Sequence, residues 1–464
     1  MVQQEIKRET PIFVEIVFRQ KQNKGGISLV AIITRQGQIF EWEELEILGD
    51  LERFRLVKEH MPDEGLMQHL ERDRNRGRDD YPVRAMWNSI LAGVIYQHPS
   101  IESLRRELSR NSQLRRMCGF EEDKIPSEWA YSRFLANLFD HEDLTNEIFE
   151  RLVALCYELL PGFGKHLALD GKAIDSFARR TNDNQKEDGR RDLDADYGAK
   201  SYKGKHQDGT LWERTIYWFG YKLHLLVDTD YELPVAYTLT PASHAEITQA
   251  HHLIGDLRTK RPQVLDVCQY LSADRGYDDT KLLARLWDDH GIRPIIDIID
   301  HWKSGEETRL FEGRDNIVYD YRGTVYCCCP KELKLREMAY NGFEKKRGTL
   351  KYRCPAGHYG FECKGKKECP VKSSIRVSID ENRRYFLPLP RSSYRFEDYY
   401  KKRAAVERVN SRLDVSFGFE QHFIRGLKKM RFRCSLALCI MLAMAIGRVK
   451  EKRPDLLRSL VQAA

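Results

Sequence analysis

Apolar residues in the middle of the chain recur in short runs that are typical of buried β-strands. One run, His166–Leu169, ends at Asp170 and Gly171. The pattern predicts a strand over this run, with Gly171 in a tight turn that leaves Asp170 exposed at the strand end. The alternative interpretation is an ordinary hairpin turn, because Asp-Gly pairs are typical of such turns.

A second apolar run, Gln269–Ala273, ends at Asp274 in the same manner. A helical pattern over Thr280–His290 follows, with Asp278 or Asp279 as a candidate cap, and an apolar, β-branched run over Ile292–Ile299 comes next. Strand, helix and strand in this order predict a βαβ unit with its acid at the carboxyl edge of a strand, where open α/β sheets bind ligands. An ordinary loop acid is the alternative.

A third stretch, Tyr399–Asp414, predicts one continuous helix with a polar face. At about 100° per residue, Tyr400, Arg403 and Glu407 fall on one narrow side together with Asp414. A helix that packs on a sheet normally has an apolar face, so this face is unusual. The alternative is a solvated face on which Arg403 and Glu407 form an i, i+4 ion pair.

The remaining pattern predicts flanking elements. Alternating runs over Phe13–Phe18 and Ile27–Thr34 predict a β-hairpin, and the stretches 43–78 and 81–137 predict helices. The segment Arg179–Trp212 is polar and densely charged, with too few apolar residues to pack, so it predicts a mobile loop.

Composition places the chain among soluble proteins with a large core. It has 464 residues, 41% hydrophobic and 32% charged, and a formal net charge of +7, which permits a polyanionic partner without requiring one. Eleven cysteines, an odd number, do not suggest a secreted disulfide framework. Met1–Thr10 are polar, and the apolar run Ser435–Ile446 is too short to span a bilayer. We therefore expect a cytoplasmic protein without a membrane partner.

The acids on the two strand ends and the helix suggest metal-dependent phosphoryl transfer. Carboxylates spread over several elements suit two Mg²⁺ ions, or Mn²⁺, because these hard cations prefer oxygen ligands. Asp170, Asp274 and Glu407 are the candidate ligands, and Asp228 and Glu246 are the alternatives.

Five stretches, taken together, resemble the DDE transposases of bacterial insertion sequences. They are LALDGKAI at 167–174, GYKLHLLVD at 220–228, TPASHAE at 240–246, SADRGYDD at 272–279, and the spacing of Tyr400, Arg403 and Glu407. The last is similar to the Tyr-x2-Arg-x3-Glu-x6-Lys signature of one group of these enzymes, but Asp414 stands where that group has lysine. The resemblance implies an α/β fold with an RNase H-like core, a mixed sheet flanked by helices, in which Asp170, Asp274 and Glu407 bind the metal ions.

The same resemblance implies a DNA transposase that cleaves transposon ends and transfers the 3′-OH strand into target DNA. Its partners would be double-stranded terminal inverted repeats and target DNA, bound by a homodimer at the bacterial nucleoid. The expected DNA contacts are Tyr400, Arg403, Arg408, Arg412, Lys428, Lys429, Arg105 and Arg106. A purely nucleolytic protein and a catalytically silent DNA-binding protein remain alternatives, and Asp414 keeps the second open.

We expect five segments along the chain. Residues 1–80 form a hairpin and a charged helical region, 81–160 a helical DNA-binding domain, 161–300 the first part of the core, 301–393 a basic Cys-rich insertion, and 394–464 the C-terminal helices of the core.

Cysteines are concentrated in the insertion. Cys329, Cys354, Cys363 and Cys369 are candidates for a structural zinc site, because four such side chains suit tetrahedral zinc. Their spacing lacks a clean Cys-x2-Cys pair, so free buried cysteines are the alternative.

Overall fold

A computed structural model forms two compact units. Unit 1 comprises residues 1–161, 176–194 and 411–464, and unit 2 comprises 162–175 and 195–410. The structure describes residues 16–23, 26–33, 49–74, 80–121, 124–178, 191–206, 208, 210–303, 305–329, 331–332, 334–371 and 373–460.

Unit 2 is built on a mixed sheet. Its strand order is β6–β5–β3–β7–β8, in which β5 is antiparallel to both β3 and β6, while β7 and β8 run parallel to β3. The strands are β3 (His166–Asp175), β5 (Leu211–Asp228), β6 (Leu233–Pro241), β7 (Tyr270–Ala273) and β8 (Arg293–Ile296). This order and these directions confirm the predicted α/β class with an RNase H-like core.

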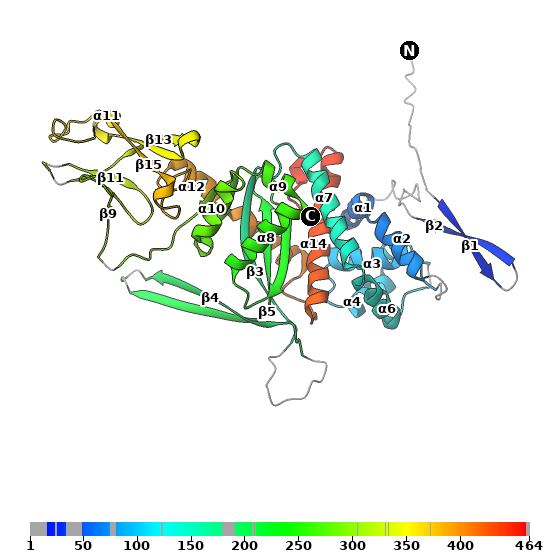
Figure 1. Ribbon diagram of the computed structural model, residues 1–464. Coiled ribbons are helices and arrows are strands. Elements are labelled where there is room, and N and C mark those ends of the chain that lie inside the picture. The colour runs from blue at the N-terminus through cyan, green and yellow to red at the C-terminus, as the bar shows by residue number, and fades with distance from the viewer. Residues whose placement is uncertain are drawn as a thin grey trace, which may run out of the picture. The chain divides into compact units, whose positions relative to one another are not determined.

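Helices flank this sheet (Figure 1). They are α8 (Glu246–Lys260), α9 (Pro262–Val267), α10 (Thr280–Asp288) and α12 (Tyr394–Lys401). Helix α13 (Ala404–Phe417) follows α12, with residues 404–410 in unit 2 and 411–417 in unit 1. Ser272, beside Ala168 in the sheet, donates to the Tyr399 carbonyl of α12 (3.5 Å), whereas Lys222, beside Ala173, pairs with Glu246 of α8 (3.5 Å). Since successive residues of a strand point to opposite faces, α12 and α8 cover opposite faces.

The single helix predicted over Tyr399–Asp414 is wrong. The chain turns at Lys402 and Arg403 between α12 and α13. The Lys402 amine bonds to Asp230 (2.7 Å), which holds this turn against the sheet. A contact between residues far apart in the sequence therefore interrupts the helix, although the local pattern predicts one continuous helix.

β5 extends beyond the sheet in a two-stranded ribbon with β4 (Asp196–Lys205), drawn in green in Figure 1. The mobile loop predicted over Arg179–Trp212 is therefore wrong for residues 196–205. Backbone hydrogen bonds between β4 and β5 form the ribbon, so it needs little burial of apolar side chains. Gly198 and Gly204 of β4 pack closely against the indole rings of Trp218 and Trp212, respectively. A Cβ on either glycine would come within 2.4 Å of the ring.

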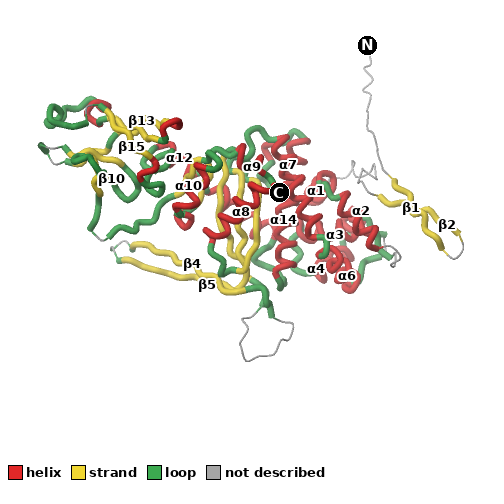
Figure 2. Tube along the Cα trace, in the orientation of Figure 1, coloured by secondary structure: helices red, strands yellow, loops and turns green. Residues whose placement is uncertain are grey.

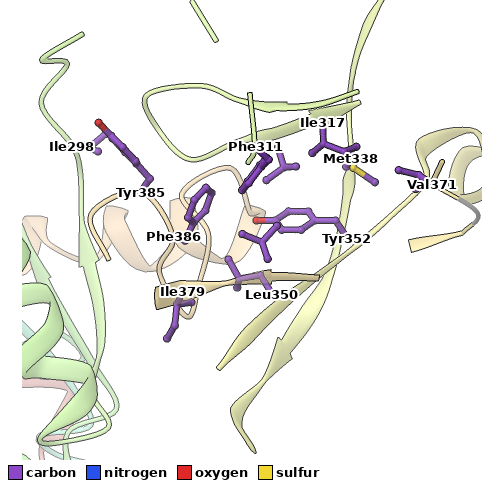
Figure 3. Packing of buried hydrophobic residues seen from close by; sticks show 12 residues of the cluster. Ile298, Phe311, Ile317, Met338, Leu350, Tyr352, Val371, Ile379, Tyr385 and Phe386 are labelled. Atoms are coloured by element: carbon purple, nitrogen blue, oxygen red, sulfur yellow. The ribbon is translucent and has the colours of Figure 1, made fainter. Parts of the chain in front are cut away.

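The Cys-rich insertion contains two small sheets. One has the order β12–β11–β10–β9, and the other β13–β14–β15 (Figure 2). Their strands are β9 (Arg309–Leu310), β10 (Ile317–Tyr319), β11 (Val325–Cys328), β12 (Leu335–Glu337), β13 (Ala339–Glu344), β14 (Thr349–Arg353) and β15 (Ser374–Ser378), with helix α11 at Pro355–Tyr359. Buried side chains including Phe311, Ile317, Leu350, Tyr352 and Phe386 give the insertion an apolar cluster of its own (Figure 3).

Unit 1 is helical, as the sequence predicts. Its helices are α1 (Glu52–His60), α2 (Glu64–Arg74), α3 (Val83–Ile95), α4 (Ile101–Arg110), α5 (Ser112–Cys118), α6 (Glu128–Phe139), α7 (Glu142–Leu159) and α14 (Leu427–Lys450). The hairpin predicted near the N-terminus is present as β1 (Ile16–Asn23) and β2 (Gly26–Ile33); Phe13 and Thr34 lie outside the described residues.

Helix α14 is long and apolar enough to cross a membrane by length and composition. It packs against α1, α3 and α7 of unit 1, and 83% of its most apolar window is buried there. Burial on all sides is what a core helix of a globular unit requires.

Candidate active site

Asp170 lies inside β3 rather than at its end. The strand continues through Gly171, whose partner on β5 is His224, so the predicted turn is wrong. A Cβ on Gly171 would lie 2.9 Å from an Oε1 atom of Glu246 on α8. Glycine is needed here because a helix-borne acid approaches the strand.

Asp274 follows the last residue of β7. The parallel pairing of β3 and β7 ends at Leu169 and Ala273, so Asp170 and Asp274 come next on two adjacent strands. The Asp274 carboxylate accepts the Gly276 N–H (2.8 Å), which fixes its side chain at the start of a 3-10 turn. The structure thus brings the first two predicted acids together.

Burial dominates the electrostatics of Asp170. The loss of hydration raises the pKa of Asp170 to about 6; the charge of Lys200 opposes this rise, and the charges of Asp274 and Glu246 add to it. A carboxylate held in this state lacks full charge compensation, so it is suited to bind cations.

Tyr277 is a site residue that the sequence reasoning did not select. Its ring is fully buried, and its hydroxyl has no hydrogen-bond partner among the described residues. Burial raises the pKa of Tyr277 well above its ordinary value, and the charges of Glu246, Asp170 and Asp274 add to this. The only sequence signal is its place in the GYDD stretch after Asp274.

Glu407 is exposed near the start of α13 and forms an ion pair with Arg403 (2.7 Å). Burial opposes protonation of Arg403, but the charges of Glu407, Tyr400 and Asp170 outweigh it and raise the pKa of Arg403. The Arg403 guanidinium lies 5.8 Å from the centre of the Tyr400 ring. Arg403 therefore interacts electrostatically with the first and the third predicted acids.

Within the described part of the chain, no three His, Cys, Asp or Glu side chains form a group arranged to hold a metal ion. The acids nevertheless fit a cation in two respects. A guanidinium already interacts with Asp170 and Glu407, and the buried Tyr277 hydroxyl is near enough for the charges of Asp170 and Asp274 to act on it.

The two alternative acids, Asp228 and Glu246, have different surroundings. Asp228 accepts the N–H groups of Gly164 (2.8 Å), Asp230 (3.0 Å) and Tyr231 (2.7 Å), so it closes the turn after β5. Glu246 approaches the face of the sheet opposite α12 and pairs with Lys222.

The predicted DNA contacts of unit 2 are partly engaged within the protein. Arg408 pairs with the buried Glu232 (2.8 Å), whereas Tyr400 and Arg403 lie beside the acids. Contact of Arg408 with DNA stays a prediction.

The predicted contacts of unit 1 lie on several helices. Arg105 and Arg106 of α4 pair with Glu102, and Lys428 of α14 pairs with Asp140 (3.0 Å). Lys429 is exposed along a groove that Phe423 and Arg425 also line, and Arg412 of α13 is half-buried with polar contacts.

Residues 166–443, more than half of the chain, match the family described as Transposase DDE domain. The chain belongs to this family. Residues 41–137 also match the family described as Transposase domain (DUF772). The protein is therefore a DDE-type DNA transposase of the insertion-sequence kind, a polynucleotidyl transferase, and the resemblance drawn from its motifs is confirmed.

Among solved structures, the transposase is similar to a piggyBac transposase, in a cryo-EM structure of its synaptic complex with hairpin DNA. The sequences are 11% identical, the match covers 89% of this chain and 80% of that chain, and the TM-score is 0.39, too low to carry an argument. No curated protein sequence matches the chain. As a DDE transposase, the protein acts on DNA, and the family uses divalent metal ions.

Proposed function

We propose that Asp170, Asp274 and Glu407 are the catalytic acids with which this transposase cleaves transposon ends and transfers the 3′-OH strand. The observation that carries the proposal is the pair of aspartates on adjacent parallel strands, one of them buried without full charge compensation. A buried carboxylate lowers stability unless it is compensated, so its retention at a ligand-binding sheet edge favours a catalytic role.

The three acids would hold two Mg²⁺ or Mn²⁺ ions. The chemistry that such ions supply in phosphoryl transfer is activation of the attacking oxygen and neutralisation of charge on the leaving oxygen. The chain's own residues do the positioning: the Gly276 N–H fixes Asp274, and the buried ring of Tyr277 places a hydroxyl donor beside both aspartates.

Arg403 is the residue that we expect to change partner. In the structure it pairs with Glu407 and interacts with Asp170. Once released from the acids, its guanidinium would be available, with Tyr400, for a DNA phosphate. Arginine suits this role because its planar fork matches phosphate geometry.

Unit 1 would bind the transposon ends. Arg106 on α4 and Lys429 on α14 are exposed cations that suit contact with the sugar-phosphate backbone. We further propose that the protein acts as a homodimer on terminal inverted repeats, at the bacterial nucleoid in the cytoplasm. Two ends must be held together for coordinated strand transfer.

The test is a strand-transfer assay on labelled terminal-repeat DNA with a target plasmid. Asp170→Asn, Asp274→Asn and Glu407→Gln should each lower transfer about 1,000-fold or more, since the metal ions contribute several kcal/mol to the transition state. DNA binding, measured separately, should change little. Normal transfer by any of the three variants would remove that acid from the proposal.

Two variants separate the third acid from its neighbours. Glu246→Gln tests the acid on the opposite face, and Glu397→Gln is a matched control on α12, where Glu397 pairs with Lys401 of the same helix (3.0 Å). We expect both to retain strand transfer within about tenfold. Cleavage without joining in the wild type would instead indicate a nuclease, and binding without cleavage a silent DNA-binding protein.

A further inference from the structure

Six cysteine side chains of the insertion line one small cavity of about 30 Å³. They come from three separate places: the end of β11, the residue before α11, and the loop that leads to β15. They are Cys327, Cys328, Cys329, Cys354, Cys363 and Cys369. No disulfide joins them.

One sulfur pair already has the separation of zinc ligands. The Sγ atoms of Cys329 and Cys363 are 4.0 Å apart. Tetrahedral zinc with bonds of about 2.3 Å holds its sulfurs about 3.8 Å apart. Cys354 lines the same cavity as this pair.

Several backbone groups surround the sulfur of Cys329. The N–H groups of Glu332, Lys331 and Gly365 donate hydrogen bonds to it. The Cys369 sulfur accepts a hydrogen bond from the Asn316 amide (3.4 Å). Such N–H donors stabilise the negative charge on metal-bound sulfur and orient the ligand.

Cys327 has a different environment. It packs against the apolar cluster of the insertion and lies inside β11, whereas Cys329 follows the end of that strand. Cys369 also packs against the cluster but has the Asn316 donor, which distinguishes it from Cys327.

We propose that Cys329, Cys354, Cys363 and Cys369 bind one structural zinc ion. The described residues contain no preformed group of three ligands, so binding requires the side chains of Cys354 and Cys369 to turn toward the 329–363 pair. The ion would tie the β11–β12 connection to the long β14–β15 connection, and thus join the two small sheets. This inference is independent of the catalytic proposal.

The experiment measures zinc in the full-length protein, purified without chelator, by elemental analysis. We expect about one zinc per chain, and less than about half as much after Cys→Ser substitution of any of the four ligands. Cys327→Ser and Cys328→Ser are matched controls that should keep the zinc, and Asp170→Asn should keep it as well. Zinc-free wild type, or loss in Cys327→Ser equal to that in Cys369→Ser, would overturn the assignment.

Cobalt substitution gives a second readout that does not depend on activity. Co²⁺ in place of zinc should show the visible bands of tetrahedral thiolate coordination in the wild type and in Cys328→Ser, but not in Cys354→Ser. Limited proteolysis after zinc removal should cut within 329–374, because the two connections lose their link. A disulfide between Cys329 and Cys363 in freshly purified protein would contradict the proposal.

Discussion

The β3–β5 pair carries two buried aspartates, Asp170 inside β3 and Asp228 at the end of β5, and they have different surroundings. Burial raises the pKa of both Asp170 and Asp228 to about 6. Asp228 accepts three backbone N–H groups, whereas Asp170 accepts that of Gly171 and is surrounded by the side-chain charges of Lys200, Asp274 and Glu246. Burial alone does not identify a catalytic acid. What distinguishes them is how far the backbone already satisfies the carboxylate.

The largest expected difference between the two aspartates is in catalysis. Asp170→Asn should lower strand transfer by about 1,000-fold or more, because its carboxylate cannot be replaced as a metal ligand. Asp228→Asn should keep the wild-type rate per folded molecule. The assay is strand transfer normalised to the folded fraction measured by circular dichroism. Equal losses in both variants would remove the distinction.

The next largest effect is on the stability conferred by Asp228. Asp228→Ala leaves the N–H groups of Gly164, Asp230 and Tyr231 without their acceptor. Each unsatisfied buried donor costs about 1–3 kcal/mol, and relief of the buried charge offsets part of this, so we expect a loss of about 2–3 kcal/mol. Urea unfolding of the metal-free protein measures it. A stabilised Asp228→Ala variant would contradict the assigned role.

For Asp170 we expect the opposite effect: its ionised carboxylate lowers the free energy of unfolding. Its pKa is raised from 3.8 to about 6, so the folded state binds more protons than the unfolded state between these pH values. Stability therefore falls as pH rises from about 4 to about 6, by up to about 3 kcal/mol, and remains lower above that range.

Asp170→Asn removes this cost. The variant should be more stable than the wild type at pH 8 by up to about 3 kcal/mol, with the difference disappearing near pH 4. Urea unfolding at both pH values, without divalent ions, measures the difference. A variant less stable than the wild type at pH 8 would contradict the destabilising effect assigned to the ionised Asp170 carboxylate.

The smallest expected effect concerns Tyr277, whose buried hydroxyl has no partner among the described residues. Tyr277→Phe should raise stability by about 1 kcal/mol and lower strand transfer about tenfold, because the donor beside the aspartates is lost. Tyr352→Phe in the insertion is the matched control, since its buried hydroxyl also lacks a partner there. That variant should gain stability without losing activity.

The sequence by itself determined what depends on neighbouring residues. Asp279, one of two candidate caps in the sequence, caps α10 through the Leu282 N–H (2.7 Å), and Ser100 caps α4 in the same way through the Ser103 N–H (3.1 Å). The strand before Asp274 and the family motifs are also local signals. Caps and short apolar runs act over a few residues, so they can be read from the sequence without the fold.

Only the tertiary structure decided which distant segments meet. β3 continues past Gly171 because β5 supplies its hydrogen-bond partners, and the polar segment 196–205 is a strand because β5 pairs with it as well. The helix breaks at Arg403, and this cation then pairs with Glu407 and interacts with Asp170. Backbone ladders and ion pairs between remote residues leave no periodic pattern in the sequence, so the charge balance of the site emerges only on folding.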